Sequence, residues 1–138
     1  MPRLNDQKTV LFVAPLYEDL EFWYPYLRPK EEGAEVVSIG PERTTYTGKH
    51  GTSMEPDEAI DSTRAIEFDA LIIPGGYAPD HMCGSQTMVE FVSEMNKQRK
   101  PIAAICHGPG CWRPPMCEQR QETYQFLLDQ RRCHKCGR

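Results

Sequence analysis

The chain has 138 residues, the size of one domain, and carries a net charge of −4 at neutral pH. This acidic balance argues against a nucleic-acid partner or an anionic membrane surface, since both attract a basic face. Hydrophobic residues make up 39% of the chain, so a packed core is expected rather than disorder. The sequence contains no apolar run long enough for a membrane span and no secretory signal. We therefore expect a cytoplasmic protein with reduced cysteines.

Four short apolar segments predict the core strands of a sheet. Each is a continuous run rich in branched residues, as a strand buried on both faces requires. The predicted strands cover residues 9–15, 34–39, 68–74 and 101–105.

The segments between the strands contain two predicted helices. The first spans residues 18–32 and ends at Gly33, and its internal Pro25 and Pro29 predict a kink or an early stop. Its apolar face is predicted to consist of Leu20, Trp23, Tyr24 and Leu27. Ser85 is predicted to cap the second helix. The apolar face of that helix is predicted to consist of Met88, Val89, Phe91, Val92 and Met95.

Strands that alternate with helices predict an α/β fold with a parallel sheet and helices on both faces. A polar, glycine-punctuated segment at residues 44–56 predicts a hairpin or loop with a short strand near residues 52–54. In parallel sheets, functional residues gather beyond the carboxyl ends of the strands. Three strands deliver residues 17–19, 75–77 and 106–107 to that edge.

The residues at this edge suggest thiol chemistry. Cys106 follows a strand directly, at a strand-to-turn junction that can favour the nucleophilic thiolate. His107 offers a base or an orienting donor, and Glu18 offers a carboxylate for proton transfer. Gly75 and Gly76 allow backbone N–H groups to approach a developing oxyanion. Spacing alone leaves a structural role for Cys106 open, because free cysteine often behaves as a small buried hydrophobe.

Four sequence strings occur together in this order. They are Y-E-D-L-E at residues 17–21, T-G-K-H-G at 47–51, I-I-P-G-G-Y-A-P-D at 72–80 and A-I-C-H-G-P at 104–109. In combination, the chain resembles the ThiJ/PfpI superfamily over residues 8–109. The most similar branch is that of the PfpI-like intracellular cysteine peptidases, also described as protein deglycases. The resemblance implies a flavodoxin-like three-layer sandwich related to class I glutamine amidotransferases.

The resemblance also implies roles for individual residues. It makes Cys106 the nucleophile, His107 its partner and Glu18 the carboxylate that hydrogen-bonds the thiol. It assigns the oxyanion to the backbone N–H groups of Gly76 and His107. Asp80 stands where the peptidase branch usually has a glutamate that reaches the neighbouring subunit's histidine, and it is the shorter acid. No cofactor and no metal are implied.

As a family member, the chain is expected to be a cofactor-independent cysteine hydrolase. Its substrates would be glycated amino groups, reactive 2-oxoaldehydes or peptides, and the full-length protein is expected to form a homo-oligomer. Two alternatives remain open: a non-catalytic redox or stress sensor that uses Cys106, and an inactive truncated family member. His50 is interpreted as a loop residue, and His81 and Cys83 are interpreted as surface or helix-approach residues.

The composition changes abruptly after Pro109. Residues 110–138 contain no Ile, Val or Ala but five Arg and four of the seven Gln. We also considered the codons of residues 129–138 in a shifted reading frame, in which the last two bases of each codon are joined to the first base of the next. In that frame the codons can encode I-K-D-D-V-I-N-A-G, a string that the family carries. We therefore interpret residues 1–109 as an incomplete ThiJ/PfpI-like domain and residues 110–138 as an out-of-frame tail. A zinc or redox pair at Cys133 and Cys136 is the alternative interpretation.

Overall fold

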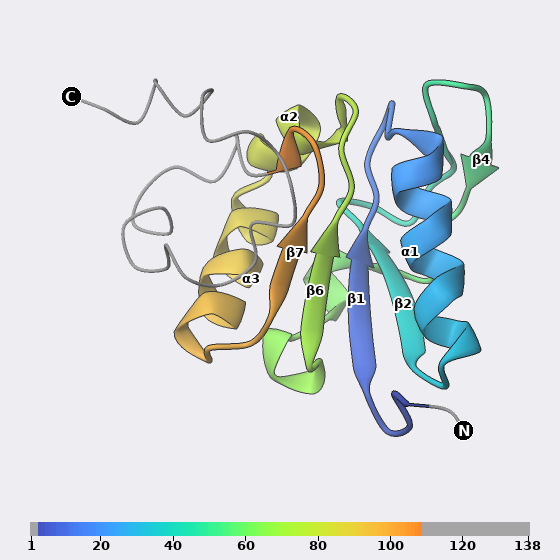
Figure 1. The fold of residues 1–138 in the computed structure, drawn as a ribbon. Helices are drawn as coiled ribbons and strands as arrows, with labels where there is room; N and C mark the ends of the chain where they lie inside the picture. Colours follow the sequence, from blue (N-terminus) through green and yellow to red (C-terminus); the bar gives the residue numbers. More distant parts are fainter. Residues whose placement is uncertain (1–2, 109–138) are drawn as a thin grey trace, which may run out of the picture.

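The computed structural model describes residues 3–108, which form a parallel sheet flanked by helices (Figure 1). Five strands pair in the order β5-β2-β1-β6-β7, and every pairing between them is parallel. The strands are β1 (Lys8–Phe12), β2 (Glu35–Gly40), β5 (Glu58–Ala59), β6 (Ala70–Ile73) and β7 (Ile102–Ala104). The α/β class and the four predicted core strands are confirmed, while the two-residue β5 is additional.

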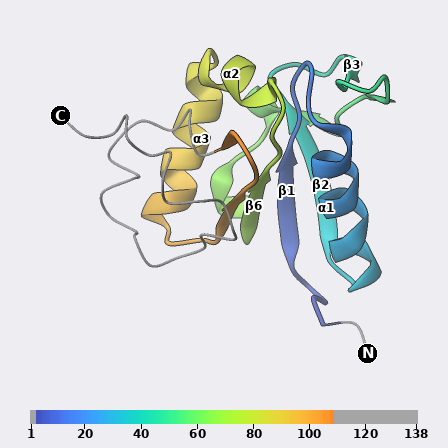
Figure 2. The ribbon, with the colours of Figure 1, turned by 45° about the horizontal axis from the view of Figure 1, so that its top comes forward.

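The helices lie on opposite faces of the sheet. The chain moves from β1 through α1 (Asp19–Glu31) to β2 on one side, and from β6 through α3 (Gln86–Lys97) to β7 on the other. Because such crossovers are right-handed, opposite directions of travel place α1 and α3 on opposite faces. Figure 2 shows the sheet between these two helices. None of the helices among residues 3–108 is both long and apolar enough to cross a membrane.

The core lies on both sides of β1. Val10, Leu11 and Phe12 are fully buried, as expected for the central strand of a parallel sheet. The ring of Phe12 packs against Phe91 of α3, with ring centroids 5.6 Å apart. Ser85 caps α3 as predicted, since its Oγ accepts a hydrogen bond from the backbone nitrogen of Met88.

Helix α1 differs from its prediction in two respects. It runs through Pro25 and Pro29 to Glu31, so the early stop was wrong. The predicted apolar face was wrong for Leu20, Tyr24 and Leu27, which are exposed, whereas the fourth predicted residue, Trp23, packs against the core. Aromatic packing accounts for both differences. The rings of Phe22, Trp23 and Tyr26 pack against one another, Phe22 is fully buried, and this contact offsets the hydrogen bonds that the prolines remove.

The predicted end of α1 at Gly33 is confirmed. Gly33 adopts a φ of 93°, and its N–H donates to the carbonyl of Lys30. The N–H of Ala34 donates to the carbonyl of Pro29. These two bonds form a Schellman motif, which turns the chain directly into β2.

The remaining segments are short. The predicted hairpin is present as the antiparallel pair β3 (Tyr46–Thr47) and β4 (Ser53–Met54). Helix α2 (Ala78–Cys83) and two 3-10 turns were not predicted, because their short sequences show no regular pattern of apolar and polar residues. The interpretation of residues 110–138, including Cys133 and Cys136, lies outside the described residues.

Candidate functional site

The candidate site lies where the order of the strands reverses. Beyond the carboxyl ends of β1 and β6, the chain leaves toward opposite faces of the sheet, to α1 and to α2–α3. Such a switch point is where open α/β sheets place their ligands. The loop after β7 reaches the same edge, since the N–H of Ile105 donates to the carbonyl of Ile73 at 3.0 Å. The predicted gathering of residues 17–19, 75–77 and 106–107 at one edge agrees with this arrangement.

Leu16 connects three loops at this edge. Its N–H donates to the carbonyl of Thr47 in the hairpin at 2.9 Å, and its carbonyl accepts from the N–H of Tyr77 at 3.0 Å. Tyr17 forms an antiparallel bridge with Gly76 beside these bonds. Leu16 itself has a φ of 59°, a conformation that non-glycine residues seldom adopt. The loops after β1 and β6 and the hairpin therefore form one hydrogen-bonded unit.

Cys106 occupies the turn that follows β7. Its φ is 56°, so an L-residue with a side chain is held in the left-handed region, and the thiol is exposed. The N–H of Gly108 donates to the carbonyl of Ile105 at 2.9 Å and closes the turn around it. A left-handed non-glycine residue is strained by about 1–3 kcal/mol, and such strain clusters at functional sites. The geometry fits the predicted strand-to-turn junction.

Gly75 provides the closest approach to Cys106. A Cβ atom added at Gly75 would lie 2.7 Å from the Cβ of Cys106 and would also collide with the Glu21 carboxylate. Only glycine fits between these two side chains. The neighbouring Gly76 has a φ of 77°, which favours glycine for a second reason.

Glu21 is the site residue that the sequence reasoning missed. Its Oε2 accepts a hydrogen bond from the N–H of Gly75 at 2.8 Å, which places the carboxylate beside Cys106. Burial raises the pKa of Glu21, and the negative charge of Glu18 raises it further. A signal was available, because Glu21 lies three residues after Glu18 in Y-E-D-L-E and thus on the same side of the helix.

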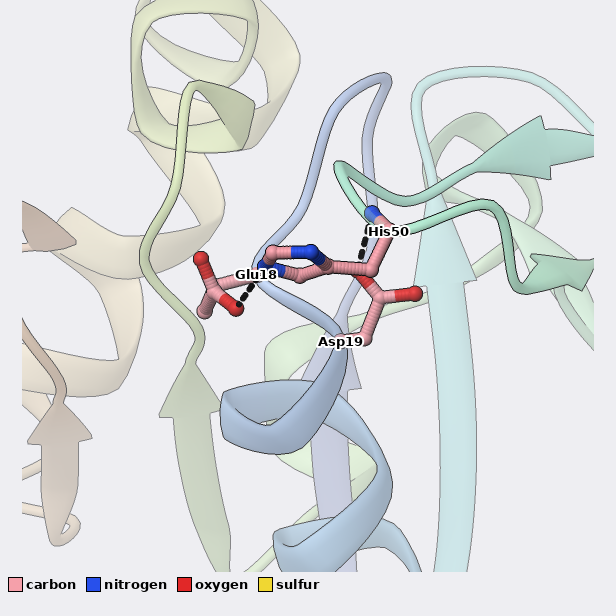
Figure 3. A group of neighbouring side chains, drawn as sticks. All are labelled: Glu18, Asp19 and His50. Carbon is pink, nitrogen blue, oxygen red and sulfur yellow. Dashed lines mark hydrogen bonds and ion pairs between the residues drawn. The ribbon is translucent and has the colours of Figure 1, made fainter.

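Glu18, the carboxylate predicted to bond the thiol, is engaged by two basic side chains of the hairpin turn. Lys49 Nζ donates to Glu18 Oε2 at 2.8 Å, and His50 Nε2 lies 3.0 Å from Glu18 Oε1. Figure 3 shows the imidazole of His50 beside this carboxylate. The pKa of Glu18 is lowered mainly by the hydrogen bond from Lys49, and His50 lowers it further. His50 is thus a loop residue, as interpreted, but one that contacts a predicted site residue.

Asp19 fixes this hairpin turn to the start of α1. Its buried carboxylate accepts hydrogen bonds from the backbone nitrogens of His50 at 2.9 Å and Thr52 at 3.1 Å, and from the Thr52 hydroxyl. Burial opposes ionisation of Asp19, but these bonds outweigh it and hold its pKa below the usual range. A Cβ at Gly48 would collide with the same carboxylate, at 2.6 Å from Oδ2. The position of Lys49 and His50 is therefore determined by Asp19.

Glu18, Asp19 and His50 bring oxygen and nitrogen atoms within 4.8 Å of one another, which is a spacing suited to metal ligands (Figure 3). Both oxygens of Asp19 already accept hydrogen bonds from the hairpin, and both oxygens of Glu18 are paired with Lys49 and His50. The Lys49 ammonium adds a positive charge that opposes a cation. The donor set fits an internal polar network better than a metal centre.

The other predicted residues lie near this edge. His107 is exposed beside Cys106, and Asp80 is exposed in the first half of α2. The backbone nitrogens of Gly76 and His107 donate no hydrogen bond to another of residues 3–108. His81 is exposed in α2, in agreement with its interpretation as a surface residue, whereas Cys83 is half-buried there.

Comparison with known proteins identifies a family and several relatives of this chain. The DJ-1/PfpI family matches residues 7–113. A deglycase of Pyrococcus horikoshii is 45% identical over 102 residues, which cover 74% of this chain and 61% of the relative. An Escherichia coli protein named as a protein/nucleic acid deglycase is 37% identical over 105 residues, covering 75% of this chain and 61% of its own. The chain therefore matches about three fifths of the length of these relatives.

Solved structures agree with the sequence comparison. A two-domain protein of Anabaena variabilis, with DJ-1/ThiJ/PfpI-like and ferritin-like domains, superposes with a TM-score of 0.74 at 40% identity. The match covers 77% of this chain and 31% of that one. DJ-1 of Toxoplasma gondii gives a TM-score of 0.67 at 28% identity, over 76% of this chain and 58% of that protein. The parallel α/β architecture is thus that of the DJ-1/ThiJ/PfpI proteins.

Proposed function

The chain belongs to the DJ-1/PfpI family, and on that premise we propose that it carries the nucleophilic site of a cofactor-independent deglycase. The substrates would be amino groups glycated by reactive 2-oxoaldehydes, or the free 2-oxoaldehydes. The observation that carries the proposal is the exposed, left-handed Cys106 packed against Gly75 and beside the Glu21 carboxylate.

In the proposed reaction, the Cys106 sulfur attacks the aldehyde-derived carbon and forms a carbon–sulfur bond. When the substrate is a glycated amine, the carbon–nitrogen bond of the hemiaminal breaks first, and the amine leaves with the bonding pair and a proton, so that an aldehyde carbon is present for the sulfur to attack. The electron pair displaced from the carbonyl moves to oxygen. The backbone N–H groups of Gly76 and His107 would stabilise that oxyanion, and a positioned donor of this kind contributes about 3–4 kcal/mol of transition-state stabilisation. After a proton shift within the adduct, water hydrolyses the resulting thioester to a 2-hydroxy acid and frees the Cys106 thiol. The exposed His107 would assist as the predicted partner of the thiol.

The proposed reaction also needs a group that carries the proton. We assign that role to Glu21, because it lies beside Cys106 and its raised pKa keeps more of it protonated near neutral pH. Glu18, the carboxylate predicted from the sequence, has a lowered pKa and is paired with Lys49, which suits it less for donating a proton. Glu18 remains a prediction, and variants of both residues are compared below.

Two further features of the full protein belong to this proposal: a cytoplasmic location and a homo-oligomer. The oligomer is supported by the outer face of α1, where Leu20, Tyr24 and Leu27 are 79%, 68% and 53% exposed. These residues lie at i, i+4 and i+7, so they form a continuous apolar stripe of the kind that marks protein interfaces. Size-exclusion chromatography of Leu20→Lys should show a smaller particle than the unmodified chain.

The enzymatic proposal is tested with a lysine derivative glycated by methylglyoxal. Release of the free amine is measured for the 138-residue chain, for a chain whose reading frame is restored after Pro109, and for Cys106→Ser in each. Amine release that disappears in Cys106→Ser supports the deglycase. If only the frame-restored chain is active, the 138-residue chain is an inactive truncated member. Reversible oxidation of Cys106 without amine release in either chain would favour the redox sensor.

A further inference from the structure

Two opposite charges lie beside Cys106 that the proposed reaction does not use. Lys49 Nζ is 2.8 Å from Glu18 Oε2 and 5.7 Å from the ring centroid of Tyr77. Tyr77 follows the Gly75–Gly76 pair, and Gly75 packs against Cys106. The backbone of Glu18 is bonded to the same loop, since its N–H donates to the carbonyl of Gly75 at 3.3 Å. The ion pair therefore stands at the edge of the sheet where the thiol is exposed.

Lys49 is held in this position both at its backbone and at the end of its side chain. The backbone N–H of Lys49 donates to the carbonyl of Tyr17 at 2.9 Å, and the next residue, His50, is bonded to the buried carboxylate of Asp19. The far end of the side chain is held by Glu18. A surface lysine normally samples many rotamers, and these bonds remove most of that freedom. A fixed charge can discriminate between ligands in a way that a mobile one cannot.

Lys49 is also electrostatically coupled to the thiol. The hydrogen bond to Glu18 is the main cause that raises the pKa of Lys49, and the charge of Cys106 contributes in the same direction. An ammonium that interacts with the sulfur also interacts with the substrate. In particular, it acts on the group next to the substrate carbon that the sulfur attacks. The carboxylate of Glu18 acts on that group with the opposite sign.

We propose that Lys49 is the charge-selecting residue of the Cys106 site. It favours aldehydes that carry a carboxylate or another anionic group next to the attacked carbon, and Glu18 moderates this preference. The inference rests on the proposed function, because it requires Cys106 to be the reactive thiol.

The test compares two alkylating reagents of nearly equal size and different charge, iodoacetate and iodoacetamide. With either reagent, the Cys106 sulfur attacks the methylene carbon, a carbon–sulfur bond forms and iodide leaves with the bonding electron pair. The rate at Cys106 is followed in the full chain by peptide mapping, which separates it from the other five cysteines. Both rates depend equally on the fraction of Cys106 that is thiolate, so this fraction drops out of their ratio. The ratio therefore reports the preference of the site for the charged or the neutral reagent. The same ratio in the urea-unfolded chain is the reference.

Opposite effects are expected from the two members of the pair. Lys49→Gln should lower the iodoacetate-to-iodoacetamide ratio about two- to fivefold, whereas Glu18→Gln should raise it by a similar factor. Lys49→Arg should retain the ratio of the unmodified chain. The ion pair Lys97–Glu94 on α3, 3.9 Å apart, supplies matched controls, and Lys97→Gln and Glu94→Gln should leave the ratio unchanged. In 1 M salt the differences should shrink, because the charges are then screened over about 3 Å.

Three outcomes would overturn the inference. An unchanged ratio in Lys49→Gln, with Cys106 still reactive, would remove Lys49 as the selecting charge and leave the proposed function intact. A ratio that falls in both Lys49→Gln and Glu18→Gln would show that the pair acts by holding the turn and not by charge. A Cys106 that reacts no faster in the native than in the unfolded chain would overturn the proposed function, and the charge selection with it.

Discussion

The carboxylate of Glu21 accepts a hydrogen bond of 2.8 Å from the backbone N–H of Gly75. This bond joins the first turn of α1 to the loop after β6, across the point where the strand order reverses. It holds a carboxyl group with a raised pKa next to the only turn among residues 3–108 that presents a cysteine with a left-handed backbone. The proposed proton transfer would thus come from the first turn of α1 and the nucleophilic attack from the turn after β7.

Glu21→Gln should lower turnover of the frame-restored chain by about 100-fold or more, the usual contribution of a positioned acid or base. The amide oxygen of Gln can still accept the hydrogen bond from Gly75, so the thermal transition should move little. Alkylation of Cys106 by iodoacetamide should continue, because the thiol remains in place. Glu18→Gln is the comparison variant. A larger loss in Glu18→Gln than in Glu21→Gln would return the proton transfer to the carboxylate predicted from the sequence.

Gly75→Ala should abolish turnover and slow the alkylation of Cys106, because the added methyl group would displace both Cys106 and Glu21. Overpacking of this kind typically costs about 1–3 kcal/mol of stability. The matched control is Gly84→Ala. A Cβ at Gly84 would lie 3.4 Å from the carbonyl of His81, close to an ordinary contact distance, and its φ is −72°. Turnover retained by Gly75→Ala would mean that the approach of Glu21 to Cys106 is not required.

Glu18 and Glu21 show which part of the site could be predicted from the sequence and which part could not. The string Y-E-D-L-E and the strand before it predicted that acidic residues reach the edge beside Cys106, and they do. Which carboxylate lies against the thiol depends on the direction in which the first turn of α1 leaves the sheet. That direction depends on the hydrogen bonds between Asp19 and the hairpin turn and on the hydrogen bond between Glu21 and Gly75. Both join residues that are more than 30 positions apart in the sequence. Local patterns do not contain such long-range contacts.

The same limit applies to helix α1. Spacing and Gly33 correctly predicted a helix and its end, because both depend on nearby residues. The choice of face was wrong because several spacings of the apolar residues are compatible with a helix, and only packing decides between them. Phe22, which the prediction left out, is fully buried, whereas Leu20 is exposed. Core strands were easier to predict, because a strand segment that is buried on both faces, such as Val10–Phe12 of β1, is apolar on both faces.

Asp19→Asn should destabilise the chain at neutral pH by about 2 kcal/mol, the range for hydrogen bonds to a charged group. The pKa of Asp19 is lowered in the folded state, so its contribution to stability is present above the unfolded value of about 3.9. That contribution is lost as the pH falls through the folded-state pKa. Urea unfolding at pH 7 and pH 3 should therefore show a difference between the variant and the unmodified chain that shrinks at pH 3. A difference independent of pH would contradict a role for the ionised carboxylate.

The interpretation of residues 110–138 as an out-of-frame segment predicts the nucleotide sequence that encodes them. Sequencing of independent genomic copies around the codon of Gly110 should show one inserted or deleted base relative to a frame that encodes I-K-D-D-V-I-N-A-G. The frame-restored chain should then show the turnover described above. Independent copies that all encode the printed residues, with no such frame open, would contradict the interpretation.

The identity of the nucleophile is tested most directly by partial alkylation of the frame-restored chain. Samples are treated with iodoacetamide for increasing times, and the fraction of each modified cysteine is measured by peptide mapping beside the remaining turnover of methylglyoxal. We predict that turnover falls in direct proportion to unmodified Cys106, regardless of the state of Cys83, and that bound substrate slows both losses together. Turnover that persists after Cys106 is fully alkylated would contradict the assignment of Cys106 as the nucleophile.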